Sequence, residues 1–97
     1  MYDIKPLPAF TEWLASIKDG MTRVRLIRRL DRVKMGLLGD VQPISEGVFE
    51  MREHFGAGWR MYIQRANVVI VMLGGGTKST QNADIKRAIE LAKQLED

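Results

Sequence analysis

Residues 48–65 read VFEMREHFGAGWRMYIQR, and this stretch decides the fold. Apolar and polar side chains alternate on both sides of its two glycines. A period of two is typical of β-strands, and glycines suit the positive φ angles of a hairpin turn. We therefore predict two antiparallel strands, residues 48–55 and 59–65, joined by the three-residue loop Gly56-Ala57-Gly58.

The alternation places two arginines, a histidine and a tyrosine on one face of this hairpin, away from the apolar side chains. With a three-residue loop, Phe55 lies opposite Trp59, and the neighbours on the polar face are His54 with Arg60, Arg52 with Tyr62, and Glu50 with Gln64. Guanidinium groups bind phosphate through bidentate bonds, and histidine or tyrosine can move protons. RNA could be cleaved here without a metal or a protein nucleophile, because its own 2′-hydroxyl attacks the phosphate. The alternative is a solvated sheet face with scattered charges.

The rest of the chain predicts three helices and two more strands. We expect an edge strand at residues 2–6, a helix from Pro8, a second helix capped by Thr22 and ended by Gly36 or Gly39, and a last helix from about Thr80. Residues 67–73 are apolar on both faces and predict a central strand covered on both sides. The order β-α-α-β-β-β-α describes a small α+β domain over residues 1–97.

Composition excludes several classes of protein. The chain has 97 residues, 45% of them hydrophobic and 28% charged, which is an ordinary globular balance. The absence of cysteine excludes disulfides and thiolate sites, and with one histidine we expect neither a metal nor a cofactor. No apolar run approaches the ~18 residues of a membrane helix, and the N-terminus lacks the apolar core of a signal peptide, so we expect a cytoplasmic protein. The net charge of +3 suits an anionic partner.

Two further segments can bind anions. On the second helix, Arg25, Arg28, Arg29 and Arg32 lie opposite the apolar stripe and could meet an RNA backbone, an acidic protein or solvent. Because they lie off the stripe, we expect their replacement to leave folding intact. Residues 74–81, GGGTKSTQ, run from a strand into a helix and offer Lys78 and backbone amides to a phosphate. The glycine spacing is not that of a Walker A loop, and a connector capped by Ser79 or Thr80 is the alternative.

Ordered motifs span nearly the whole chain. They read Phe10-x-x-Trp13-Leu14, Arg25-x-x-x-Arg29-Leu30-x-Arg32, Gly39-Asp40-Val41, Glu46-Gly47-Val48-x-Glu50-x-Arg52, Phe55-Gly56-x-Gly58-x-Arg60-x-Tyr62 and Leu73-x-Gly75-Gly76-x-Lys78-x-x-Gln81-x-x-Asp84-Ile85. Together they resemble the HigB-like addiction-module killer proteins of the RelE/ParE superfamily of toxins. The resemblance implies a RelE-like α+β fold, with two N-terminal helices packed on a twisted, mainly antiparallel sheet and a C-terminal helix. It also implies an antitoxin partner, commonly a HigA-like helix-turn-helix protein, in a toxin–antitoxin hetero-oligomer.

The same resemblance implies an activity, because many HigB-like and RelE-like proteins cleave mRNA on the ribosome without a metal. Carried over by motif, Arg52 and Arg60 would bind phosphate, Tyr62 would stack on a base or move a proton, and Lys78 would neutralise developing charge. Gln81 would orient the substrate or merely begin the last helix.

One candidate and two alternatives stand beside this assignment. His54 matches no position of the family, so its catalytic role rests on the hairpin geometry alone. The superfamily also contains ParE-like proteins, which inhibit DNA gyrase and lack a ribonuclease site. A third possibility is an inactive toxin that serves only as a corepressor.

Overall fold

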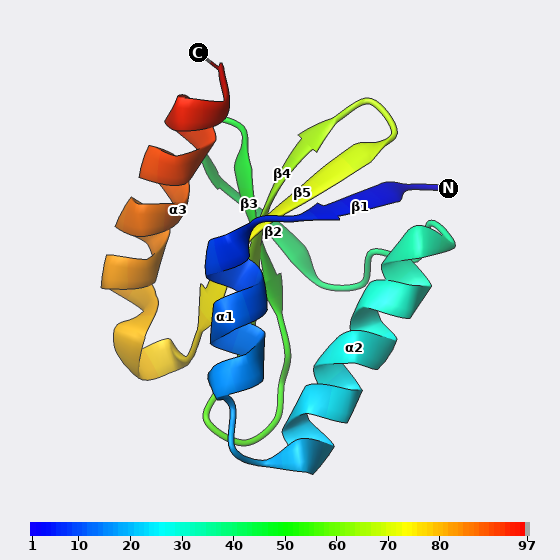
Figure 1. Ribbon diagram of the computed structural model, residues 1–97, viewed down its shortest axis with the longest axis vertical. Coiled ribbons are helices and arrows are strands. Elements are labelled where there is room, and N and C mark those ends of the chain that lie inside the picture. The colour runs from blue at the N-terminus through cyan, green and yellow to red at the C-terminus, as the bar shows by residue number, and fades with distance from the viewer. Residues whose placement is uncertain (97) are drawn as a thin grey trace.

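The computed structural model describes residues 1–96 and shows three helices and one five-stranded sheet (Figure 1). The elements are β1 (Asp3–Pro6), α1 (Pro8–Ser16), α2 (Gly20–Lys34), β2 (Val41–Ser45), β3 (Val48–Arg52), β4 (Arg60–Ala66), β5 (Val69–Gly76), the 3-10 turn η1 (Lys78–Thr80) and α3 (Gln81–Glu96). The strand order is β1-β5-β4-β3-β2, in which β1 runs parallel to β5 and the other neighbours are antiparallel. The predicted α+β class is confirmed, with a mixed sheet; the predicted domain also includes Asp97, which lies outside the described residues.

Side chains bury both faces of the sheet. On one face, Phe10 of α1 and Leu26 and Val33 of α2 pack in a cluster with Met61 and Met72 of the sheet. On the other face, α3 packs on a second cluster that contains Val48, Tyr62, Leu73, Ala88 and Ala92. Figure 1 shows α2 running back along the molecule from the end of α1, as an αα-hairpin does. Within residues 1–96, no helix is long and apolar enough to cross a membrane.

The β3–β4 connection is longer than predicted. β3 ends at Arg52 and β4 begins at Arg60, so Phe55 does not pair with Trp59. The N–H of Gly58 donates to the carbonyl of Phe55 at 3.1 Å, and this turn takes Phe55 out of the ladder. The predicted neighbours are therefore wrong, because the true register is shifted by two residues; the wrong pairs are His54 with Arg60, Arg52 with Tyr62, and Glu50 with Gln64. Arg52 lies opposite Arg60, Glu50 opposite Tyr62 and Val48 opposite Gln64, so the face assignments hold while the partners change.

β2 was not predicted. It is an edge strand that pairs only with β3, and its register shifts between Pro43 and Ser45. Proline has no N–H to donate, so a sheet tolerates it at an edge. The same proline obscures the strand pattern in the sequence.

Helix α2 begins earlier than predicted. Its N-cap is Asp19, whose carboxylate accepts from the N–H of Met21 at 3.3 Å and from the hydroxyl of Thr22 at 2.8 Å. Thr22 is therefore a partner of the cap and not the cap itself. At the other end, Gly36 lies just beyond the C-cap with φ +91°, a conformation typical of the glycine that ends a helix, so the first of the two predicted stops is confirmed.

β5 is an interior strand covered on both faces, as predicted, but it lies between β1 and β4, begins at Val69 and extends through the three glycines to Gly76. A Cβ at Gly75 would enter the ring of Trp13, and a Cβ at Gly76 would overlap the carboxylate of Asp84. Gly74 differs, because nothing lies within 4 Å of the position its Cβ would take. Beyond the strand, Thr77 caps the 3-10 turn η1, around which Thr77 and Thr80 bond reciprocally, and α3 begins directly after Thr80.

We expect Gly75→Ala to lower the free energy of unfolding by about 1–3 kcal/mol, because the added methyl group overpacks against Trp13. Gly74→Ala is the matched control, and its stability should stay within about 1 kcal/mol of the parent. Urea unfolding of both variants measures the difference. Equal losses would show that Trp13 does not constrain the strand.

Candidate functional site

A pocket of about 330 Å³ lies where the β3–β4 hairpin meets η1, and we call it the hairpin pocket. Its lining residues are Arg52, Glu53, His54, Phe55, Gly56, Gly58, Arg60 and Lys78. Four of the predicted catalytic residues, Arg52, His54, Arg60 and Lys78, thus meet around one concave surface. The end of β3, the following loop, the start of β4 and η1 each supply one of them.

Glu50 holds both arginines of the hairpin pocket in place. Its carboxylate is 2% exposed, and Oε1 accepts from Nε of Arg52 at 2.7 Å. Oε2 lies 3.6 Å from Nε of Arg60 and accepts from Nε2 of Gln81 at 2.9 Å. Arg60 also donates from Nη1 to the carbonyl of Gly58 at 2.6 Å. The buried carboxylate therefore fixes two cross-strand guanidinium groups that would otherwise repel each other.

Glu50 was not among the predicted site residues, although its position two residues before Arg52 is a usable signal. Residues i and i+2 of a strand share a face, so a glutamate there lies between the two arginines of that face. Gln81 begins α3 and binds Glu50, which matches the second of its two predicted roles.

The stability of the protein should depend on Glu50 in acid. Burial opposes ionisation, but hydrogen bonds from Arg52 and Gln81 outweigh it and hold the pKa of Glu50 below its ordinary value. An unfolded glutamate takes up its proton near pH ~4.3, so the stabilisation is complete above that pH and is lost as the pH falls through the folded-state pKa. We expect the melting temperature to fall over this acid range, and to fall less steeply in Glu50→Gln. An equally steep fall in both proteins would contradict the assignment.

His54 is held by a carboxylate at the rim of the hairpin pocket. Its Nε2 lies 2.6 Å from Oδ2 of Asp40, and its side chain is 75% exposed. Hydrogen bonds from Gln42 and from His54 hold the pKa of Asp40 below its ordinary value. An imidazole with one nitrogen bound to a carboxylate presents the other nitrogen for proton transfer. Asp40 was missed, because it lies 14 residues before His54 and no local pattern joins them.

Tyr62 lies outside the hairpin pocket. Its side chain is fully buried beneath α3, and its hydroxyl has no hydrogen-bond partner among the described residues. Burial, and then the charges of Glu50 and Asp84, raise the pKa of Tyr62 well above its ordinary value. The expectation that Tyr62 stands on an open polar face is wrong, because α3 covers the middle of β4 and leaves only its start free. Tyr62 cannot stack on a base unless α3 moves away.

The basic face of α2 is smaller than predicted. Arg25, Arg28 and Arg32 are exposed, whereas Arg29 is 5% exposed. The guanidinium group of Arg25 lies 3.7 Å from the ring centroid of Phe55, so this face reaches the rim of the hairpin pocket. The prediction of Arg29 as an exposed RNA-binding residue is wrong.

Arg29 instead joins α2 to the two segments that carry the site. Its guanidinium group donates to the carbonyls of Leu38, Asp40 and Arg52 and forms an ion pair with Glu53. Residues 38 and 40 lie outside the helices and strands, so Arg29 supplies hydrogen bonds there, beside the one that the carbonyl of Asp40 accepts from the N–H of Arg52 at 3.1 Å. Burial is the largest effect on Arg29 and lowers the pKa of its guanidinium group.

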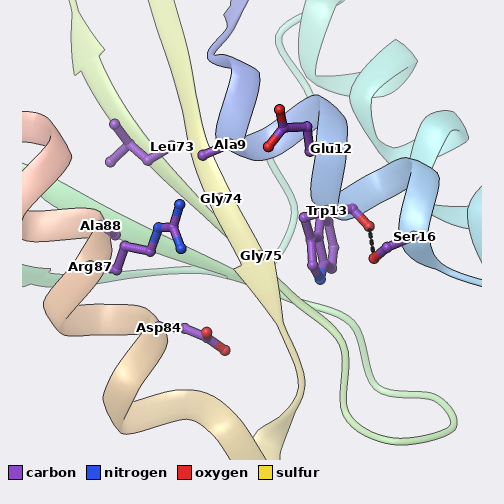
Figure 2. A pocket seen from close by; sticks show the side chains of 10 residues that line it. All are labelled: Ala9, Glu12, Trp13, Ser16, Leu73, Gly74, Gly75, Asp84, Arg87 and Ala88. Atoms are coloured by element: carbon purple, nitrogen blue, oxygen red, sulfur yellow. Dashed lines mark hydrogen bonds between the residues drawn. The ribbon is translucent and has the colours of Figure 1, made fainter.

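A second cavity, also of about 330 Å³, lies between α1, β5 and α3, and we call it the α1–α3 pocket (Figure 2). Its lining residues are Ala9, Glu12, Trp13, Ser16, Leu73, Gly74, Gly75, Asp84, Arg87 and Ala88. None of the predicted site residues lines it. Over residues 1–96, the structure contains no group of three histidine, aspartate or glutamate side chains that could hold a metal ion.

Comparison with known proteins gives one close relationship. The chain is 38% identical over 93 residues to an uncharacterized protein of Haemophilus influenzae, and the match covers 95% of this chain and 94% of that protein. No family model matches the chain.

Proposed function

We propose that this chain, which belongs to the same family as that Haemophilus influenzae protein, is a toxin that cleaves ribosome-bound mRNA. The hairpin pocket carries the proposal, because Arg52, Arg60 and Lys78 surround it together with a histidine bound to a carboxylate. Three cations suit a phosphodiester, and the imidazole suits proton transfer. The motif resemblance to HigB-like proteins of the RelE/ParE superfamily supports the same activity and a RelE-like topology.

Cleavage would proceed by internal attack within the RNA strand. The ribose 2′-oxygen bonds to phosphorus as the bond to the 5′-oxygen breaks, which leaves a 2′,3′-cyclic phosphate and a 5′-hydroxyl. His54 takes the proton of the 2′-hydroxyl, and the departing 5′-oxygen takes a proton from water. Arg52 and Arg60, fixed by Glu50, stabilise the charge that grows on the phosphoryl oxygens, and Lys78 adds a third cation. This reaction uses neither a metal nor a cofactor.

The proposed RNA and ribosome contacts rest on the charged surfaces, and the antitoxin partner rests on the motif resemblance alone. The exposed arginines of α2, Arg25, Arg28 and Arg32, extend the positive charge of the hairpin pocket and would contact the ribosome or the mRNA backbone. A HigA-like helix-turn-helix antitoxin would bind the toxin in a hetero-oligomer. The toxin would act in the cytoplasm, where ribosomes translate.

Expression of the chain alone should arrest growth by blocking translation. Incorporation of a radiolabelled amino acid should fall before incorporation of labelled thymidine, because ribosome-bound mRNA is the target. His54→Ala with Arg60→Ala is the control, and cells that express it should keep both rates. If thymidine incorporation fell first, and purified protein inhibited supercoiling by gyrase, the chain would be a ParE-like inhibitor.

A further inference from the structure

The α1–α3 pocket lies at an open edge of the sheet. β1 pairs with β5 only from Val69 to Met72, and after Pro6 the chain turns away into α1. Leu73, Gly74 and Gly75 then form the floor of the pocket, between α1 and α3 (Figure 2).

Gly74 adjoins the register shift opposite Tyr62 and Ile63, but neither a positive φ nor a close contact requires a glycine there. Its φ is not positive, and nothing lies within 4 Å of the position its Cβ would take. Its neighbours Gly75 and Gly76, in contrast, leave room for Trp13 and Asp84. A residue without a side chain at position 74 keeps the floor of the pocket flat and open.

The walls of the pocket combine an aromatic ring with unlike charges. The indole of Trp13 descends beside Gly75, and the guanidinium group of Arg87 extends from α3 toward Gly74 (Figure 2). Among the residues that the structure describes, no carboxylate lies within ion-pair distance of Arg87. Glu12 and Asp84 supply two carboxylates. Their charges outnumber that of Arg87 and disfavour a phosphate, so the pocket suits a planar, uncharged group with both donors and acceptors.

We propose that the α1–α3 pocket binds a guanine base of an RNA strand. That the base belongs to RNA rests on the proposed function. Guanine presents two adjacent acceptors, O6 and N7, which arginine binds, and two adjacent donors, N1–H and N2–H, which a carboxylate binds. Arg87 serves the acceptors, and Glu12 serves the donors, because Oδ2 of Asp84 already accepts from the hydroxyl of Thr80 at 2.5 Å. Trp13 offers the ring on which an unstacked base packs. A volume of about 330 Å³ is within the range of nucleoside-sized sites.

The test measures binding of labelled five-nucleotide RNAs in the absence of ribosomes. One strand carries a single guanosine among uridines, and the other carries an adenosine in its place. The wild-type chain should bind the guanosine strand about ten-fold more tightly, within the range of one good bidentate base contact. Gly74→Val, which fills the pocket, and Arg87→Gln should both abolish the preference. Lys86→Gln removes an exposed charge on the same helix that does not line the pocket, so it should keep the preference.

Two further arms locate the site and separate the sources of the base. Trp59→Phe leaves Trp13 as the sole tryptophan. The guanosine strand should quench the fluorescence of Trp13, and the adenosine strand should not. GMP should compete with that strand; binding of GMP without binding of the strand would overturn the proposal in favour of a free-nucleotide site. Equal affinity for both strands, or a preference that survives Gly74→Val, would also overturn it. Because cleavage is not measured here, failure of this proposal leaves the nuclease assignment standing, and the reverse holds.

Discussion

Replacing Arg29 with alanine should lower the free energy of unfolding by about 3–5 kcal/mol, because it leaves the carboxylate of Glu53 without its ion pair in a nearly buried position. The same change leaves the carbonyls of Leu38, Asp40 and Arg52 without their side-chain donor. A loss of this size approaches the whole stability of a small domain, which is ~5–15 kcal/mol. Urea unfolding followed by circular dichroism measures it.

Two neighbouring variants make this result specific. Arg28→Ala removes an exposed arginine from the same helix and should change the stability by less than about 0.5 kcal/mol. Arg29→Lys keeps a charge for Glu53 but lacks the planar fork that reaches several carbonyls, so it should fall between the two. If Arg29→Ala unfolded at the same urea concentration as Arg28→Ala, Arg29 would not hold the site segments together.

Replacing Arg60 with alanine should slow RNA cleavage by roughly 10²–10³-fold, the cost of losing a preorganised donor aimed at transition-state charge. Glu50 keeps Arg52 and Gln81 as partners in this variant, so the fold should persist. Arg60→Lys should recover only part of the rate, because an ammonium group keeps the charge and loses the bidentate geometry. Single-turnover cleavage of mRNA on programmed ribosomes measures the rates.

The matched control for Arg60 is Arg65→Ala, which removes an exposed arginine from the other end of β4, outside the hairpin pocket. Its cleavage rate should equal that of the parent. Full cleavage by Arg60→Ala, at a wild-type melting temperature, would remove Arg60 from the site.

Local patterns predicted every helix and strand except β2, and the faces of the hairpin, but not its cross-strand partners. Alternation along β3 and β4 places Glu50 and Arg52 on the same face as Arg60 in any register that preserves the period of two. The register itself depends on the turn, and the bond from Gly58 to Phe55 makes that turn longer than the glycines indicate. The N-cap of α2 was predicted wrongly for a related reason. Asp19 and Thr22 are both good capping residues, and the path of the chain into the helix decides that Asp19 is the cap.

The parts of the site that the sequence did not predict depend on distant contacts. Arg29 meets carbonyls of residues 38, 40 and 52. Asp40, just before β2, meets His54, just after β3, because the two strands pair antiparallel and bring these ends together. Tyr62 is buried because α3, about 20 residues later in the chain, folds over β4. Periodicity within one element carries no information about such approaches.

The ends of the RNA fragments test most directly whether the hairpin pocket cleaves mRNA by internal attack. Purified wild-type protein is added to ribosomes programmed with a defined mRNA, and the fragments are analysed by mass. We expect cleavage only when ribosomes are present, with a 2′,3′-cyclic phosphate on the upstream fragment and a 5′-hydroxyl on the downstream fragment, and no cleavage by His54→Ala with Arg60→Ala. Intact mRNA, or fragments with a 3′-hydroxyl and a 5′-phosphate, would contradict it.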